Sequence, residues 1–401
     1  MNAPSTIGSK PAAASAISGH LDTRTAGMEV AEQLHDALGG TCDLVLLFVT
    51  FHHVAAFEHV ADHIRTTLSP RVMMGVTAET VLGGDDELDG LAGLSAIALR
   101  LPGANLHPFS FSKDDPLPLK KPDLLPERIG LGPDHRLTLL LADPFSTPIT
   151  RILPLLTDCG GEQPVILAGG LASGASQAGY NRLLLDDMIS PIGGVGVTIS
   201  GEMDVDFIVS QGCRPIGSPL LVTRAENHLI LELGGRKATE VLREVGQNLS
   251  DNEKKLLSNG LFIGTVINEY KDHFGRGDFL IRSVLGQDQK RGGILAGELG
   301  KVGQTVQFQV RDAKTASEDL QLLLDAQQLE KDPFGAMLFT CNGRGQRLFG
   351  APNHDLDMIH ARLNHVPTAG FFCAGEIGPI GTQSFLHGHT ASLVIFREKT
   401  D

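Results

Sequence analysis

One arrangement of segments recurs three times along the chain and constrains the fold more than any other feature. An apolar strand is followed by a segment with helical spacing, a second apolar strand, a polar loop that contains glycine, and a third strand. The first copy begins at residues 43–51 (DLVLLFVTF), a run typical of a strand buried on both faces. The other copies begin at residues 137–142 and 336–340. The order predicts strand–helix–strand units and an α/β (α+β) fold.

The polar loops of the three copies are similar but not identical. Glu79 and Glu376 follow the second strand in the first and last copies, whereas the middle copy has the loop Gly169-Gly170-Leu171-Ala172-Ser173-Gly174 without an acid. Two interpretations stay open at this point. The pattern is either an internal duplication or the common recurrence of strand–helix–strand units.

The length of the chain indicates more than one domain. A chain of 401 residues is too long for one ordinary hydrophobic core. Residues 1–27 are rich in Ala, Ser, Thr and Gly, and we expect them to be a disordered arm. The pair Gly234-Gly235 marks a boundary between a first domain, 28–234, and a second, 235–401. We therefore expect two related mixed-sheet domains with helices packed on the sheets.

The amino-acid composition disfavours some classes of protein and indicates a cellular compartment. The net charge of −14 disfavours a nucleic-acid surface, which needs clustered Lys and Arg. The apolar runs are too short to cross a bilayer, so we expect no membrane insertion. Five widely spaced cysteines suit reduced thiols in the cytoplasm. The sequence has no CxxC pair and no dinucleotide or P-loop motif, so we expect no cofactor and no structural zinc.

The strongest candidate site lies near the C-terminus, in the loop between 371–374 and 392–396. Glu376 directly follows an apolar strand, and glycines allow the loop backbone to approach a bound group. His387 and His389 are two residues apart, so in an extended segment they point to the same side. One acid and two imidazoles would then share a pocket. The alternative is that these side chains are hydrogen-bonded to loop backbone.

A second candidate follows the strand at 336–340, in the sequence Cys341-Asn342-Gly343-Arg344-Gly345. An arginine between two glycines can turn its guanidinium toward a carboxylate or phosphate, which it pairs in bidentate fashion. An internal salt bridge to Glu376 is the competing interpretation. Both hold if the pair lines a pocket.

Two kinds of chemistry other than simple binding fit the same residues. Cys341 or Cys373 would be the thiolate of a hydrolase or transferase, with His387 or His389 as base and Glu376 as orienting group. Alternatively, Glu376 and the two histidines would bind a metal ion. Strand cysteines are usually small buried hydrophobes, and such metal sets often arise by chance. We assign no catalytic residue and no metal ligand.

Several motifs in order resemble the FIST family: GVTAETVLGG, GCRPIGSP, FTCNGRG, GFFCAGEIGPIG and FLHGHTASLVIF. The resemblance implies a FIST N-terminal and a FIST C-terminal domain in an intracellular sensory protein. It implies a small-molecule ligand, such as an amino acid, and a separate partner protein for signalling. A protein-interaction scaffold is a further alternative.

The resemblance supplies no established site residues, so the ligand-binding residues are our own hypothesis. They are Cys341, Asn342, Arg344, Glu376, His387 and His389. Arg344 and Glu376 would form a charged pair that meets the carboxylate and ammonium groups of the ligand. Asn342 and the two histidines would orient it.

Overall fold

The structure is a computed structural model that describes residues 10–297 and 301–399. The chain forms two compact units. The larger unit contains the chain up to Val209, residues 321–386 and the chain from Thr390, and the smaller contains residues 210–320 and 387–389. The boundary predicted near residue 235 would separate the chain into two consecutive segments. The two compact units are not consecutive segments, because the smaller contains residues on both sides of 235.

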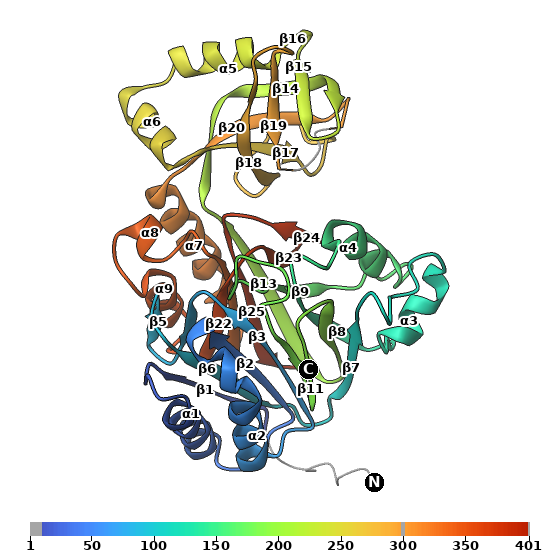
Figure 1. Ribbon diagram of the computed structural model, residues 1–401, viewed down its shortest axis with the longest axis vertical. Coiled ribbons are helices and arrows are strands. Elements are labelled where there is room, and N and C mark those ends of the chain that lie inside the picture. Colours follow the sequence, from blue (N-terminus) through green and yellow to red (C-terminus); the bar gives the residue numbers. More distant parts are fainter. Residues whose placement is uncertain (1–9, 298–300, 400–401) are drawn as a thin grey trace. The chain divides into compact units, whose positions relative to one another are not determined.

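The first sheet of the larger unit has the strand order β1-β6-β2-β3-β10-β11. Figure 1 labels β1, β2, β3 and β6 of this sheet, near helices Thr23–Leu38 (α1) and Phe57–Leu68 (α2). Its strands are Ala12–Ser18 (β1), Leu94–Arg100 (β6), Leu44–Thr50 (β2), Val72–Ala78 (β3), Leu183–Leu185 (β10) and Met188–Ser190 (β11). β2 and β3 are parallel, and the other neighbouring pairs are antiparallel.

Strand β1 lies within the segment 1–27 that we expected to be a disordered arm. Ala14, Ala16 and Ser18 are buried in alternation. Small residues at alternate positions share one face of a strand and pack closely against the sheet. The structure thus orders residues 12–18 of this segment, whereas residues 1–9 lie outside the described residues.

The second and third sheets repeat the strand order of the first. The second consists of Asn105–Phe111 (β7), Gly194–Ser200 (β12), His135–Ala142 (β8), Leu167–Leu171 (β9), Glu376–Ile380 (β23) and Gln383–His387 (β24). The third consists of Met203–Gln211 (β13), Thr390–Glu398 (β25), Gly335–Cys341 (β21), Thr368–Cys373 (β22), Val81–Gly83 (β4) and Asp86–Leu88 (β5). In both, the central pair is parallel and its neighbours on either side are antiparallel to it.

Each sheet is completed by a hairpin from another copy of the repeated arrangement. The hairpin β4–β5 follows β3 in the chain but pairs with β22. The hairpin β10–β11 follows β9 but pairs with β3, and β23–β24 follows β22 but pairs with β9. The three copies therefore exchange hairpins in a closed ring. One strand order in three sheets favours an internal triplication over chance recurrence.

One glycine occupies the equivalent position of the second strand in every copy. Gly75, Gly169 and Gly370 each lie opposite a leucine of the central strand. A Cβ atom there would lie 2.4 Å, 2.0 Å and 1.8 Å, respectively, from that leucine's carbonyl oxygen. No side chain fits at such distances. These glycines explain part of the repeated pattern in the sequence.

The larger unit has a core shared by the three sheets and helices outside them. Leu44, Leu46 and Phe48 of β2 belong to the shared core, which also receives side chains of β8 and β21. The intervening residues Val45 and Leu47 pack with helices α1 and α2. The helices of this unit are Thr23–Leu38 (α1), Phe51–Ala56 (η1), Phe57–Leu68 (α2), Pro122–Leu124 (η2), Leu125–Arg128 (α3), Ile149–Asp158 (α4), Gln346–Phe349 (α8) and His354–Arg362 (α9). Helix α7, Ala313–Gln327, belongs to both units.

The smaller unit is an antiparallel barrel. Its strands, in spatial order, are Cys213–Glu226 (β14), Thr305–Arg311 (β20), Leu261–Val266 (β17), Phe279–Asp288 (β18), Gly293–Ala296 (β19), Leu229–Leu233 (β15) and Arg236–Lys237 (β16). An additional pairing of β14 with β15 closes the sheet. Ala238–Gln247 (α5), Asp251–Leu256 (α6) and Leu257–Asn259 (η3) follow β16, and Val241 of α5 packs into the barrel core.

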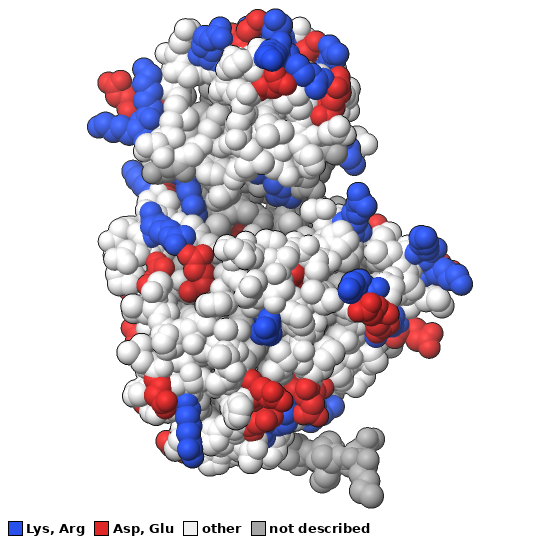
Figure 2. Space-filling view, in the orientation of Figure 1, with Lys and Arg blue, Asp and Glu red and all other residues white. Residues whose placement is uncertain are grey.

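Exposed charges contribute little to the stability of this fold. Acidic and basic side chains lie in small mixed groups on the face shown in Figure 2. A typical exposed pair, Arg236–Glu244 at 2.6 Å, contributes at most about 1 kcal/mol. The buried cores therefore carry most of the stability.

The α/β class with mixed sheets and packed helices is confirmed. Among the described residues, no helix combines the length and the apolar character needed to cross a membrane.

Candidate functional site

The turn after β21 presents three of the predicted site residues. β21 is parallel to β22, with Cys341 opposite Cys373, so both strands end at the same edge of the sheet. The N–H of Arg344 donates to the carbonyl oxygen of Cys341 at 2.8 Å, and the N–H of Asn342 donates to that of Cys373 at 3.1 Å. Gly345 ends the turn with φ of 59°, a value that favours glycine. The backbone of the turn is therefore fixed.

Arg344 is fully buried and pairs with Asp355, in the first turn of α9. Its Nε donates to Oδ2 of Asp355 at 2.6 Å, and its Nη2 donates to Oδ1 at 2.9 Å. Nδ1 of His354 lies 3.0 Å from the same Oδ1. Burial alone would raise the pKa of Asp355, but Arg344 and His354 outweigh it and hold that pKa below its usual range. The aspartate is therefore ionised at neutral pH.

Glu376 is the residue that we expected to pair with Arg344. It is fully buried, and its Oε2 accepts hydrogen bonds from the N–H and the hydroxyl of Thr390 at 3.1 Å and 2.7 Å. Burial would lower the pKa of Arg344, but Asp355 above all, and also the charge of Glu376, raises it. Glu376 thus acts on Arg344 through its charge, whereas the ion pair described for Arg344 is with Asp355.

Sequence reasoning overlooked Asp355 although a signal for it was present. The residue lies in the first turn of a helix that the spacing predicts, where acids are favoured by the helix dipole. We predicted Glu376 as the partner of Arg344 because it directly follows a strand and lies in a glycine-rich loop. Both acids lie near the guanidinium, and only the three-dimensional structure decides which one is held by two hydrogen bonds.

Two polar atoms of this turn are buried without a hydrogen-bond partner. Among the described residues, Nη1 of Arg344 and Oδ1 of Asn342 belong to this group. One is a donor and the other an acceptor. Leaving such a group unpaired costs about 1–3 kcal/mol. A group that pairs with Nη1 has to be an acceptor, and a group that pairs with Oδ1 has to be a donor.

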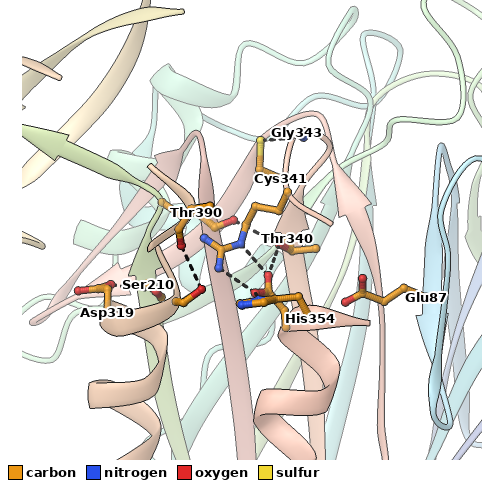
Figure 3. A network of polar contacts seen from close by, with 12 residues as sticks. Glu87, Ser210, Asp319, Thr340, Cys341, Gly343, His354 and Thr390 are labelled. Carbon is orange, nitrogen blue, oxygen red and sulfur yellow. Dashed lines mark hydrogen bonds and ion pairs between the residues drawn. The ribbon is translucent and has the colours of Figure 1, made fainter. Parts of the chain in front are cut away.

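The two cysteines at this edge differ in environment. Cys373 is buried, and burial raises the pKa of its thiol well above its ordinary value. Cys341 is half-buried, and its Sγ accepts the N–H of Gly343 at 3.4 Å (Figure 3). Electrostatics also couples Cys341 to the guanidinium of Arg344. Cys341 is therefore the better placed of the two for chemistry at sulfur.

An unpredicted acid, Glu87 of the exchanged hairpin, supports α9 from outside. Its Oε2 accepts the N–H of Asn353 at 3.0 Å, and its own N–H donates to Oδ1 of Asn353 at 2.7 Å. Asn353 is the N-cap of α9 and has φ of 62°. Burial, and then the charge of Asp355, raises the pKa of Glu87 to about 8. A neutral carboxyl group thus holds the end of the helix that carries Asp355.

The two predicted histidines lie in the smaller unit. β24 ends at His387, and His389 has φ of 66°, so the assumption of an extended segment is wrong here. The ring of His389 lies 4.3 Å from that of Phe262, and its Nε2 lies 3.4 Å from the hydroxyl of Ser283. Burial, together with the nearby Arg311, lowers the pKa of His389 to about 3. The imidazole is therefore neutral at physiological pH.

The structure brings four of the six predicted residues together in the larger unit: Cys341, Asn342, Arg344 and Glu376. His387 and His389 belong to the smaller unit.

Comparison with protein families accounts for nearly the whole chain. The model of the FIST N domain matches residues 43–236, and that of the FIST C domain matches residues 238–379. The chain belongs to the FIST family.

Two mycobacterial relatives of this FIST protein are similar over almost their full length. An uncharacterized protein of Mycobacterium tuberculosis (strain H37Rv) is 39% identical over 379 residues, which cover 94% of this chain and 97% of the relative. An uncharacterized protein of Mycobacterium bovis is 38% identical over 393 residues, which cover 94% of this chain and 96% of the relative. Neither name indicates a ligand.

The two FIST domain matches contain different residues of the site. FIST domains are sensory domains of signal-transduction proteins. The FIST C match contains the turn after β21 and Glu376, whereas it ends before His387. The FIST N match contributes Glu87 through the exchanged hairpin. The environment of Arg344 thus depends on both domains.

Proposed function

We propose that this FIST protein is a sensory protein that binds a small zwitterionic molecule, such as an amino acid, at the turn after β21. The main support for this proposal is the hydrogen bonding of Arg344. Asp355 accepts hydrogen bonds from two of its nitrogens, whereas Nη1 is buried and has no hydrogen-bond partner in the part of the chain that the structure describes. A ligand carboxylate would supply the missing acceptor.

Asn342 supplies the second half of the recognition. Its Oδ1 is a buried acceptor without a partner, two residues from the guanidinium. A ligand ammonium group would donate to this oxygen. A donor and an acceptor on one fixed turn therefore select a molecule that carries both charges, over one that carries a single charge.

The remaining predicted residues have secondary roles in this proposal. Glu376 adds negative charge near Arg344, which favours an ammonium group and disfavours a second carboxylate on the ligand. His387 and His389 stay predicted ligand contacts, and separate variants of each test them.

The first test uses Asn342, because Arg344 also stabilises the fold. The purified full-length protein is titrated with each of the common amino acids by calorimetry. Asn342→Ala removes an unpartnered atom, so we expect it to leave stability intact and to weaken binding about tenfold or more. Gln346→Ala, an exposed neighbour in the same segment, is the matched control. Equal affinity in Asn342→Ala and the wild type would reject the proposal.

We further propose that the protein is cytoplasmic and signals through a separate partner protein, as the family resemblance implies. Cross-linking in cell extract with and without the bound amino acid tests this. A partner protein whose cross-linking yield changes when the amino acid is added supports this role. Cross-linking yields that do not change with the amino acid contradict it.

A second candidate function rests on Cys341. Its thiol is half-buried, accepts a backbone N–H and lies near a guanidinium, conditions that stabilise a thiolate. A Cys-dependent hydrolase or transferase would use it as nucleophile. Rapid, stoichiometric alkylation of Cys341 at neutral pH supports this function, and slow alkylation contradicts it.

A further inference from the structure

A second cluster of chemically active side chains lies at the other end of α9. His360 is in the last turn of this helix, His365 is in the loop that follows, and Asp85 is in the turn of the hairpin β4–β5. Nδ1 of His360 lies 3.5 Å from Oδ1 of Asp85, and the two imidazole ring centres are 5.3 Å apart. One ligand atom from each of the three residues lies within 4.8 Å of the others.

The backbone on both sides of the cluster is held in place. The N–H of His365 donates to the carbonyl oxygen of His360 at 3.0 Å. Asn364 and His365 have φ of 53° and 50°, so two successive left-handed residues turn the chain back over the helix end. On the other side, Nδ2 of Asn353 donates to the carbonyl oxygen of Asp85 at 3.2 Å. The cluster therefore does not depend on flexible loops.

We propose that Asp85, His360 and His365 bind one divalent transition-metal ion such as Zn²⁺. Imidazole nitrogen and carboxylate oxygen are ordinary ligands of zinc. Three protein ligands leave the fourth tetrahedral position to water. Bonds of about 2.0–2.1 Å place tetrahedral ligand atoms about 3.4 Å apart, close to the separation of His360 from Asp85. The separations that involve His365 are up to 4.8 Å, and the exposed side chains of Asp85 and His365 would rotate to close them.

The electrostatic environment agrees with a cation site. The carboxylate of Asp85 lies 3.5 Å from Nδ1 of His360 and brings a negative charge to the cluster. The net charge of −14 also draws cations to the protein.

Binding at this place would join distant parts of the chain. Asp85 belongs to the hairpin that the first copy contributes to the third sheet, and both histidines belong to the third copy. The same helix carries Asp355, the partner of Arg344, at its opposite end. A bound ion would therefore fasten the exchanged hairpin to the helix that positions Arg344. The evidence for the metal site does not rest on the proposed amino-acid site.

The test is a zinc titration of the full-length protein after treatment with a chelator. Calorimetry should show one tightly bound equivalent, and Co²⁺ should give the visible absorption bands of a tetrahedral site. The melting temperature should rise with the zinc concentration, because the ion binds the folded state. Absence of such binding in the wild type overturns the proposal.

The variants avoid the nearly buried His360, whose loss could unfold the protein. His365→Ala and Asp85→Asn change exposed side chains, and each should weaken zinc binding about tenfold or more. His35→Ala removes an exposed histidine of α1 and should change nothing.

The exposed His59 and His63 lie one turn apart on α2 and are the main competing site. His59→Ala/His63→Ala should retain the tight equivalent. The proposal is overturned if this double variant loses it while His365→Ala keeps it.

Discussion

Asp355 holds the guanidinium of Arg344 through two hydrogen bonds, 2.6 Å and 2.9 Å long, and both side chains are buried. A planar group fixed at two nitrogens cannot rotate, so the direction of its third nitrogen is set by the fold. Nη1 of Arg344 is therefore oriented before any ligand arrives. Recognition by a pre-oriented group costs less conformational entropy on binding.

The ion pair should be essential for stability. Arg344→Ala leaves Asp355 charged and buried without its partner, and we expect a loss of about 3–5 kcal/mol in the free energy of unfolding. Urea denaturation measures it. Arg347→Ala removes an exposed arginine that pairs with Glu79 at 2.6 Å and should cost at most about 1 kcal/mol. Similar losses in both variants would contradict a special role for Arg344.

Glu87 should make stability depend on pH in a defined direction. Its pKa is raised to about 8 in the folded state from an ordinary 4.5. Between these values the folded protein binds more protons than the unfolded chain, so stability decreases as pH rises, by up to about 1.4 kcal/mol per pH unit.

Glu87→Gln should remove this contribution, because glutamine keeps the acceptor for Asn353 and does not titrate. The advantage of the wild type over Glu87→Gln should therefore shrink from pH 5 to pH 8 (about the range between the two pKa values). Urea denaturation across this range measures it. Glu58→Gln, an exposed acid of α2, is the control. A constant difference between Glu87→Gln and the wild type would show that Glu87 is ionised throughout.

The repeated glycines should tolerate no side chain. Gly370→Ala would place a Cβ atom 1.8 Å from a backbone carbonyl oxygen, so the central strands must separate. We expect a loss of about 3 kcal/mol or more, measured by thermal or urea unfolding. Gly132→Ala, whose Cβ would lie 3.8 Å from its nearest neighbour, should change stability by less than about 0.5 kcal/mol. A tolerated Gly370→Ala would refute the close approach of the two strands.

The two cysteines at the site edge should differ in reactivity. Cys373 is buried with a raised pKa, so alkylation in the folded protein should be far slower at Cys373 than at Cys341. Peptide mass spectrometry after timed alkylation measures both rates. Cys341→Ser should abolish the fast alkylation, and Cys373→Ser should preserve it. The reverse pattern would exclude the environments described for these thiols.

Much of the secondary structure was predictable from local patterns. The apolar runs at 43–51 and 336–340 form strands, and the segment with helical spacing in the third copy forms α9. The recurrence of glycine-bearing loops also pointed to repeated units. Alternation within β1 was obscured by its composition, because Ala and Ser give little hydropathy contrast.

The arrangement of the strands in space was not predictable in this way. The exchange of hairpins depends on pairings such as Phe371 with Val81, 290 positions apart in the sequence, and no local pattern encodes them. The sequence carried a signal for both Asp355 and Glu376, but it did not show which of the two acids forms two hydrogen bonds with Arg344. The prediction for His389 assumed a continuous strand, but β24 ends at His387 and His389 itself has a left-handed backbone.

In the proposed function, Arg344 receives the carboxylate of the ligand. The most direct measurement compares, by calorimetry on the wild-type protein, the amino acid that binds best with its own carboxamide, which differs only in the lost negative charge. Our account predicts that the carboxamide binds about tenfold more weakly or worse, because Nη1 would lose its charged acceptor. Equal affinities for the two compounds would contradict it.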